Sequence, residues 1–140
     1  MREIKFRAWD KINKRMCRVG RIEWSIDDYF VVWIEWDEKD EHREELRNLS
    51  QVDIMQYTGL KDKYGKEIYE GDIILYQVND NYKCKATVNW SKGGFVFMWQ
   101  DKTSPSNLSD FWFENTDNKI TEVIGNVYES NIEELKCQRE

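Results

Sequence analysis

The stretch from Gln56 to Tyr76, QYTGLKDKYGKEIYEGDIILY, constrains the fold more than any other part of the sequence. Its glycines separate short runs that are rich in Tyr, Ile, Leu and Val, and they stand at Gly59, Gly65 and Gly71. Glycine adopts backbone conformations that strain other residues, whereas aromatic and branched aliphatic residues favour strands. The pattern therefore predicts short β-strands that are joined by tight turns.

The lysine that follows Gly65 raises the question of a phosphate-binding loop. Such a loop has four residues between its glycines and a Ser or Thr after the lysine, and it opens a helix. Here five residues separate Gly59 from Gly65, Glu67 stands in place of the hydroxyl residue, and a strand-forming run follows. We therefore expect no phosphate site.

A structural role accounts for these residues instead. We expect Gly59 to end the strand before it and Asp62 to cap a turn in which Gly65 takes the left-handed position. Gly71 and Asp72 are expected to form a corner from which the next strand starts. None of the five is expected to bind a ligand.

The rest of the chain also reads as strands and turns. Glycines at 93 and 94 suit the tight turn of a hairpin. The acidic run EWDEKDEHREEL reads as a solvated loop or short helix, and the segment from Ser130 to Lys136 reads as a Ser-capped helical turn. We expect a loop over 101–110 and strands over about 3–9, 17–24, 29–36, 52–58, 85–90, 95–99, 111–115 and 120–128.

Length and composition predict one soluble domain. A chain of 140 residues with 40% hydrophobic residues can bury one sizeable core. No apolar run is long enough for a membrane helix, and the first residues lack the apolar segment of a secretory signal. The widely separated Cys17, Cys84 and Cys137 suit reduced thiols, so we expect a cytoplasmic protein.

Charge is distributed unevenly along the chain. Residues 1–21 hold eight Lys or Arg and two acidic residues, a net charge of +6, whereas residues 22–56 hold three and eleven, a net charge of −8. A basic segment that contains Trp9 could contact nucleic acid, as small barrels with exposed aromatics do. Two oppositely charged segments could also attract each other in an oligomer. The alternation of charged and apolar residues in EIKFRAW is, however, typical of the wet face of a strand.

The residues offer little catalytic chemistry. His42 is the one histidine, so a nucleophile–histidine centre would depend on it, and a surface histidine is the simpler reading. The adjacent carboxylates Asp27-Asp28 and Glu44-Glu45 point to opposite faces if they lie on strands, so they cannot jointly hold a metal. We expect no catalytic residue, no cofactor and no metal site.

The segment YFVVWIEW, 29–36, is apolar on both of its alternating faces. One face can join the core, and the other needs a second layer, another subunit or a partner. Trp33 and Trp36 are therefore the candidate interaction surface, for a homo-oligomer or for another protein.

Three stretches together indicate a family. REIKFRAWD, MQYTGLKDKYGKEIYEGDIILY and EVIGNVYES closely resemble the YopX family of small proteins from phages and prophages. The resemblance implies one domain over 1–140: N-terminal strands and a charged segment over 1–55 pack against a partly open SH3-like β-barrel over 56–140. It implies a phage or prophage origin and supplies no function or site residues. We expect a mainly β, non-enzymatic protein-interaction module that binds a host or phage protein, with nucleic-acid binding through the basic segment as the alternative.

Overall fold

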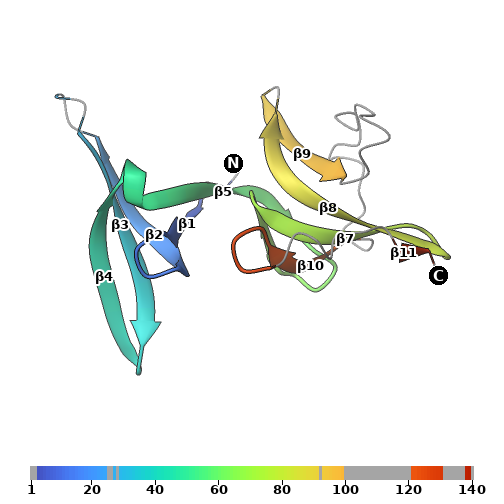
Figure 1. Ribbon diagram of the computed structural model, residues 1–140, viewed down its shortest axis with the longest axis horizontal. Helices are drawn as coiled ribbons and strands as arrows, with labels where there is room; N and C mark the ends of the chain where they lie inside the picture. The colour runs from blue at the N-terminus through green and yellow to red at the C-terminus, as the bar shows by residue number, and fades with distance from the viewer. Residues whose placement is uncertain are drawn as a thin grey trace. The chain divides into compact units, whose positions relative to one another are not determined.

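The computed structural model describes residues 3–24, 27, 29–91, 93–99, 121–130 and 138–139. The chain divides into two compact units, Glu3–Gln56 and Tyr57–Glu140. Both consist of antiparallel strands, which run from blue to green in the first unit and from green to red in the second (Figure 1). The mainly β class is confirmed. The expected loop 101–110, strand 111–115 and helical turn after Ser130 lie outside the described residues.

The first unit is a curled antiparallel sheet. Its strand order is β4-β3-β2-β1-β5. Its core holds Ala8, Cys17, Val32, Ile34 and Val52, with Val19, Phe30, Trp36 and Ile54 packed against them. The strands and one short 3-10 helix are β1 (Phe6–Asp10), β2 (Arg15–Trp24), β3 (Phe30–Glu38), β4 (Glu41–Asn48), η1 (Leu49–Gln51) and β5 (Val52–Lys61).

The expectation of a loop or short helix in the acidic run is wrong, because Glu41–Asn48 is strand β4. It pairs with β3 residue by residue, from Glu38 opposite Glu41 to Val31 opposite Asn48. Lys39 and Asp40 turn the chain with φ of 51° and 62°, the left-handed conformation that two-residue hairpin turns require. Charged side chains suit an edge strand because they discourage pairing with other chains.

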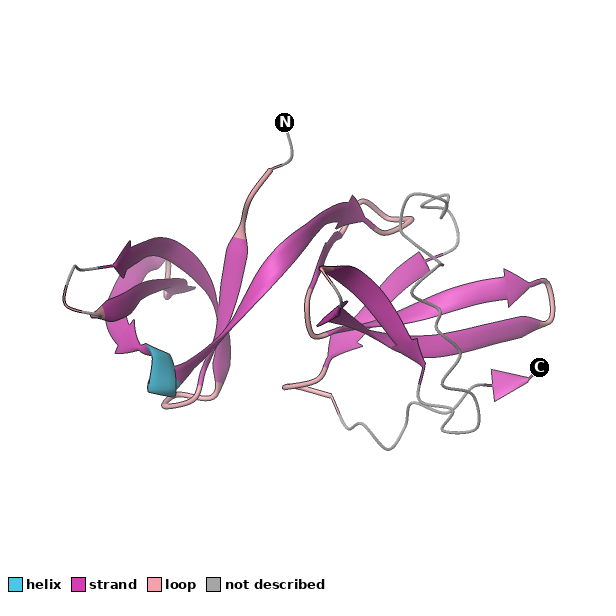
Figure 2. Cartoon of the chain, turned by 90° about the horizontal axis from the view of Figure 1, so that it is seen from above, coloured by secondary structure: helices cyan, strands magenta, loops and turns pink. Residues whose placement is uncertain are grey.

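The second unit is built on a second antiparallel sheet, seen from another side in Figure 2. Its strand order is β10-β7-β8-β11, and β9 also pairs with β8. Its core holds Ile68, Ile74, Ala86, Val88, Phe97 and Val123. The strands are β6 (Glu67–Tyr69), β7 (Asp72–Asn79), β8 (Tyr82–Ser91), β9 (Gly94–Trp99), β10 (Thr121–Asn126) and β11 (Gln138–Arg139).

Strand β5 takes part in pairing at both of its ends. Its first half pairs with β1, from Val52 to Gln56, and its second half pairs with β6. The pairs among the described strands do not run round a closed circle, which confirms a partly open barrel. The packing of the N-terminal strands against the second half stays a prediction.

The turn residues of the opening stretch adopt specific geometries. Gly65 and Gly71 have φ of 82° and 79°. Gly59 does not end its strand: β5 continues to Lys61, and Gly59, with φ of 87°, lies where the pairing with β6 shifts register. Such a bulge absorbs an extra residue without ending the strand.

Two buried aspartates hold the turns around these glycines. Asp62 accepts hydrogen bonds from the backbone N–H of Tyr64 and Lys66 at 2.9 Å each, and from that of Val123 at 3.0 Å. Asp72 accepts one from the N–H of Tyr69 at 2.8 Å. Asp62 therefore ties the 62–66 turn to strand β10.

Candidate interaction face

Strand β3 presents its two sets of side chains to different surroundings. Val32 and Ile34 are fully buried in the core of the first unit, whereas Trp33 and Glu35 are only half-buried on the other face. Register places Arg21 of β2 and Leu46 of β4 directly beside Trp33. The following residues share this side of β2, β3 and β4 and are called the Trp33 face: Arg18, Arg21, Glu23, Val31, Trp33, Glu35, Asp37, His42, Glu44 and Leu46.

Polar groups hold the Trp33 ring in place without covering it completely. The indole Nε1 donates a hydrogen bond to Glu23 Oε1 at 3.2 Å, and the Arg21 guanidinium carbon lies 4.8 Å from the ring centre. Arg21 is in turn bridged to Glu23 at 2.6 Å. Leu46, on the other side of Trp33, keeps 42% of its surface exposed. Together they form a small apolar centre with a charged border.

Trp36 lies on the opposite side of β3 from Trp33. It packs against the core, and the Arg15 guanidinium carbon lies 3.5 Å from the centre of its ring. The two candidate tryptophans therefore do not form one surface. Trp33 is the one that a partner on the Trp33 face could reach.

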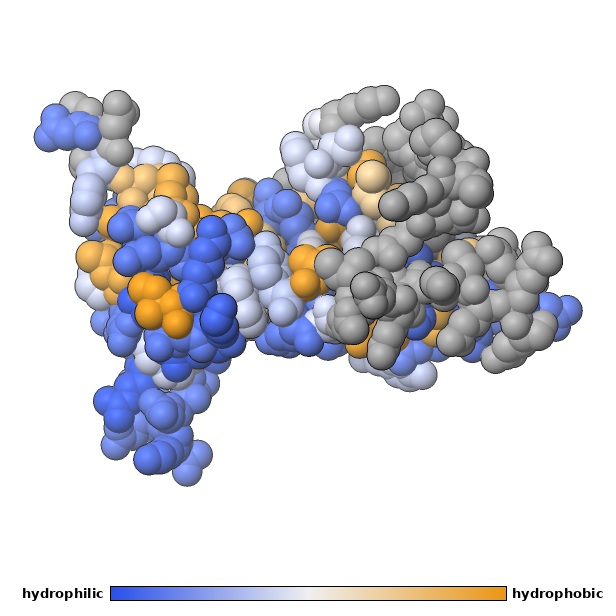
Figure 3. Space-filling model, in the orientation of Figure 1, coloured by the Kyte–Doolittle hydropathy of each residue, from blue (hydrophilic) through white to orange (hydrophobic). Residues whose placement is uncertain are grey.

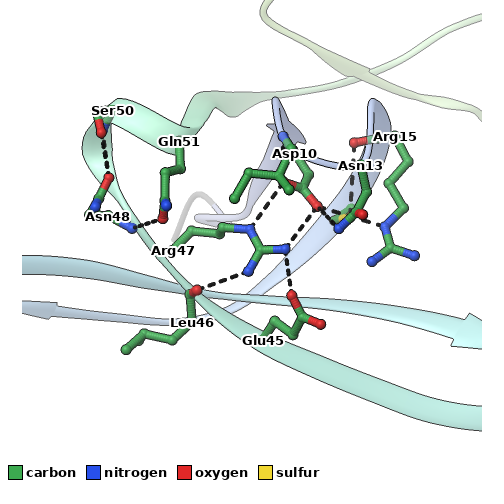
Figure 4. A network of polar contacts seen from close by, with 11 residues as sticks. Asp10, Asn13, Arg15, Glu45, Leu46, Arg47, Asn48, Ser50 and Gln51 are labelled. Carbon is green, nitrogen blue, oxygen red and sulfur yellow. Dashed lines mark hydrogen bonds and ion pairs between the residues drawn. The ribbon is translucent and has the colours of Figure 1, made fainter.

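A buried ion pair fixes the curl of the sheet beneath this face (Figure 4). Arg47 of β4 donates from Nε and Nη2 to the two carboxylate oxygens of Asp10 in β1, at 3.1 and 3.3 Å. Two strands separate β1 from β4 in the sheet order, and a flat sheet would hold them about 14 Å apart. The direct contact is possible because the sheet curls.

The environment of Asp10 keeps it ionised. Burial alone raises the pKa of its carboxyl, but hydrogen bonds from Arg47, Asn13 and the N–H of Ile12 outweigh that effect, so the pKa lies below its usual range. The Arg47 Nη2 also bridges to Glu45 Oε2 at 2.5 Å, and its Nη1 donates to the Leu46 carbonyl at 3.0 Å. Every side of the guanidinium therefore has an acceptor.

The border of the Trp33 face nearest the β3–β4 turn is acidic. Glu35 of β3 stands opposite Glu44 of β4, and Asp37 stands opposite His42. Arg18 of β2 reaches Asp37 at 3.0 Å, and its hydrogen bond lowers the pKa of that carboxyl. Donor atoms of Glu35, His42 and Glu44 lie within 4.8 Å of one another.

This group was missed in the sequence because only carboxylates adjacent in sequence were considered. Glu35 and Glu44 are nine positions apart and become neighbours through strand pairing. The one signal that could have found them was the Lys39-Asp40 turn. Read as a hairpin turn, it fixes the register of both strands and brings Glu35 and Glu44 face to face.

Three cations of the basic N-terminal segment form ion pairs with acidic residues outside it. Lys11 bridges to Asp53 at 3.2 Å and Lys5 to Glu3 at 2.9 Å, in addition to the pairs made by Arg18 and Arg21. Arg15 lies against Trp36. Part of the positive charge of residues 3–21 is therefore balanced by carboxylates outside the segment.

Hydrophilic and apolar surface alternate over the first unit. Figure 3 shows one side of the molecule, with small orange areas among blue where β2, β3 and β4 lie and a blue end at the β3–β4 turn.

The described residues contain no helix that is long and apolar enough to span a bilayer.

Comparisons with known proteins agree with this architecture. The family model described as YopX protein matches residues 5–133. The chain belongs to the YopX family. Its structure is similar to the crystal structure of protein EF1440 from Enterococcus faecalis, with a TM-score of 0.60 and 26% sequence identity over 97% of this chain and 100% of that one. A comparison with curated proteins gives no match.

Proposed function

We propose that this YopX protein is a non-enzymatic interaction module of phage or prophage origin that binds another protein through the Trp33 face in the cytoplasm of the host. The observation that carries the proposal is the half-buried Trp33 beside the exposed Leu46, within a border of charged side chains. Protein interfaces have an aromatic or aliphatic centre and a polar rim, and tryptophan is enriched among the residues that dominate binding.

The charge of this face indicates the kind of partner. The Trp33 face carries four acidic residues against two basic ones: Glu23, Glu35, Asp37 and Glu44 against Arg18 and Arg21. A partner with a basic surface and an apolar side chain at its centre complements this arrangement. Such complementarity accelerates association and selects among partners more than it strengthens binding.

The alternative of nucleic-acid binding has less support. Phosphate neutralisation by free Lys and Arg supplies most of the affinity of such proteins. The ion pairs of Lys11, Arg18 and Arg21 with their acidic neighbours reduce what the basic segment can offer. The acidic surface of β3 and β4 lies in the same unit and repels phosphate.

The environments of the reactive side chains support a role in binding over one in catalysis. Cys17 is buried, and burial raises the pKa of its thiol, which removes the thiolate that a nucleophile needs. Cys84 is also buried, and His42 is exposed on the edge strand.

Capture of a partner followed by affinity measurement tests the proposal. The full chain, immobilised and exposed to lysate of the infected host, should retain a partner whose affinity is then measured with purified proteins. Trp33→Ser and Leu46→Asp should each weaken binding by more than about 10-fold, because truncation of a central residue typically costs 2 kcal/mol or more. Trp90→Ser is the matched control, since Trp90 is a 51% exposed tryptophan of the second unit.

Two results would contradict the proposal. One is a partner that binds all three variants with the affinity of the wild type, which would place the interface elsewhere. The other is tight, salt-dependent binding of duplex or single-stranded nucleic acid by the purified chain, which would favour the alternative. Thermal melts of each variant separate loss of binding from loss of folding.

A further inference from the structure

Two glutamates face each other on the β3–β4 hairpin at unusually close quarters for like charges. Glu35 and Glu44 are direct cross-strand partners in the register of the two strands. Carboxylates in such positions repel each other and destabilise the pair. Their repulsion lowers the stability of the hairpin unless a cation between the two carboxylates compensates it.

The cationic side chains nearby form their ion pairs with other acids, and Arg18 attracts Glu35 only at longer range. Arg18, which stands opposite Glu35 in β2, places its Nη1 3.0 Å from Asp37. Arg43 bridges to Glu41 at 2.7 Å. Within the part of the chain that the structure describes, neither Glu35 nor Glu44 makes an ion pair shorter than the usual 4.0 Å limit.

A histidine completes a set of ligand types. His42 lies two residues before Glu44, hence on the same face of β4, and the three donor atoms lie within 4.8 Å of one another. Ligand atoms around one Zn²⁺ at about 2.0–2.2 Å lie roughly 3–4 Å apart. Rotation of these half-buried and exposed side chains is enough to close that gap.

Two neighbouring features fit a metal ligand set. The Nδ1 of His42 faces Asp37 Oδ1 at 3.7 Å, and a proton on Nδ1 leaves Nε2 as an acceptor for a cation. Metal-binding histidines usually direct their second nitrogen at a carboxylate in this way. Gly20 of β2 leaves room for the Glu35 carboxylate, because a Cβ at this position would overlap Glu35 Oε1.

We propose that Glu35, His42 and Glu44 bind one divalent cation of the Zn²⁺ type, with Asp37 as the outer partner of the histidine. Imidazole together with carboxylate suits Zn²⁺ and its first-row neighbours, whereas Mg²⁺ and Ca²⁺ prefer oxygen ligands alone. The site is exposed, so its remaining coordination positions are open to water or to a donor from another molecule. The proposal does not rest on the protein-interaction function, although its ligands lie at the acidic border of the Trp33 face.

Titration of the full chain with ZnCl₂ tests the site directly, with the imidazole resonances as the readout. The chain has a single histidine, so these signals report on His42 alone. They should shift and saturate at one equivalent of Zn²⁺. The titration is done on the Cys137→Ser variant, so that the thiol of Cys137 does not compete for Zn²⁺. The other two thiols, of Cys17 and Cys84, are buried. MgCl₂ at the same concentration should leave the imidazole signals in place.

Single substitutions that remove one candidate ligand at a time decide which side chains bind the cation. Glu44→Gln and His42→Gln should weaken Zn²⁺ binding, measured by calorimetry, by more than the about 10-fold that loss of an outer partner costs. Glu41→Gln removes the same charge from the opposite face of β4 and should leave the affinity unchanged.

Three results would overturn the proposal. The first is the absence of any imidazole shift at micromolar to millimolar Zn²⁺. The second is equal weakening by Glu41→Gln and Glu44→Gln, which would mean that the cation responds only to net charge. The third is an unchanged affinity in His42→Gln, which would remove the histidine from the site.

Discussion

The buried Asp10–Arg47 pair is the residue-scale contact on which the first unit depends most. Breaking a buried pair leaves one charge without compensation and costs about 3–5 kcal/mol. We therefore expect Arg47→Met and Asp10→Asn each to lower the free energy of unfolding by about that amount, measured by urea denaturation. Lys11→Ala, which removes an exposed pair with Asp53, should cost less than about 1 kcal/mol.

The comparison of these variants also tests the closure of the sheet. If Arg47→Met were as stable as Lys11→Ala, the Asp10–Arg47 contact would not hold the curl of the first unit. The double variant Asp10→Asn, Arg47→Met should lose less than the sum of the two single losses, because it leaves no buried charge alone.

Acid should destabilise the protein through Asp10 and Asp62. Burial raises the pKa of each carboxyl, but hydrogen bonds to the charged form outweigh that effect, so both folded-state pKa values lie below the usual range of an aspartate. The unfolded chain then binds more protons, and the stabilisation is complete above the unfolded pKa and lost as the pH falls through the folded pKa. Denaturation between pH 6 and pH 2 should show this fall.

A substitution identifies the contribution of one carboxylate to that pH dependence. Asp62→Asn should reduce the slope of stability against pH below about pH 5, because it removes a buried carboxyl whose pKa is lowered in the folded chain. Parallel curves for the wild type and Asp62→Asn would contradict the role of Asp62.

Local chemistry explains which residues could be interpreted from the sequence. The Asp62 turn depends on backbone groups within four residues of the aspartate, and its geometry follows from the residue types. The bond from the Val123 N–H to the same carboxylate spans 61 positions and leaves no local trace. The Asp10–Arg47 pair spans 37 positions and is invisible for the same reason.

At the scale of elements, the corner at Gly71 connects two strands of the second unit. Its N–H donates to the Val88 carbonyl at 2.8 Å, its carbonyl accepts from Val127 at 2.9 Å, and its φ is 79°. A β-branched residue is strained at positive φ, so Gly71→Val should cost about 2–3 kcal/mol. Thermal or urea unfolding measures the loss.

Gly65→Ala is the matched control for this corner. Gly65 has a similar φ of 82°, but a Cβ there would meet nothing within 4 Å. Its cost should be limited to backbone strain of about 1 kcal/mol. A Gly71→Val protein that melts within a degree or two of the wild type would refute the role of the corner.

Strand β4 shows where sequence patterns stop being informative about elements. A strand is recognised by alternation of apolar and polar residues, and EHREELRN has one apolar residue among eight. Its exposed edge position allows charged residues on both faces, so the strand lacks the apolar–polar alternation from which strands are predicted. Strands β3 and β5 are predicted instead from runs that are rich in apolar residues, 29–36 and 52–58, and each of them contributes buried side chains to a core.

At the scale of the whole molecule, the resemblance to YopX proteins implied the fold and left the sites open. The overlap of residues 5–133 with the family model explains why the architecture could be expected. The Trp33 face and the Glu35–His42–Glu44 group depend on the register of β3 with β2 and β4. The sequence indicates Trp33 as a candidate contact residue, but its neighbours on β2 and β4, and the Glu35–His42–Glu44 group, follow only from the register.

Self-association is the prediction that belongs to the whole molecule. The first unit combines the half-buried Trp33 and exposed Leu46 with charges of both signs, and two copies could pair these features in opposite directions. If a second copy takes the place of another protein on the Trp33 face, the 17.0 kDa chain will sediment as an oligomer at micromolar concentration. Trp33→Ser should return it to a monomer, and added salt should weaken it because exposed charges are screened.

Trp36→Ser is the control that distinguishes loss of an interface from loss of core packing in the same sedimentation experiment. Trp36 packs against the core and under Arg15, so its loss should lower stability while the sedimentation of the folded fraction stays that of the wild type. A wild-type chain that sediments as a monomer, with an unchanged profile for a folded Trp33→Ser, would exclude self-association through this face. The Trp33 face would then remain for a different protein, because no second copy would cover its half-buried Trp33 and exposed Leu46.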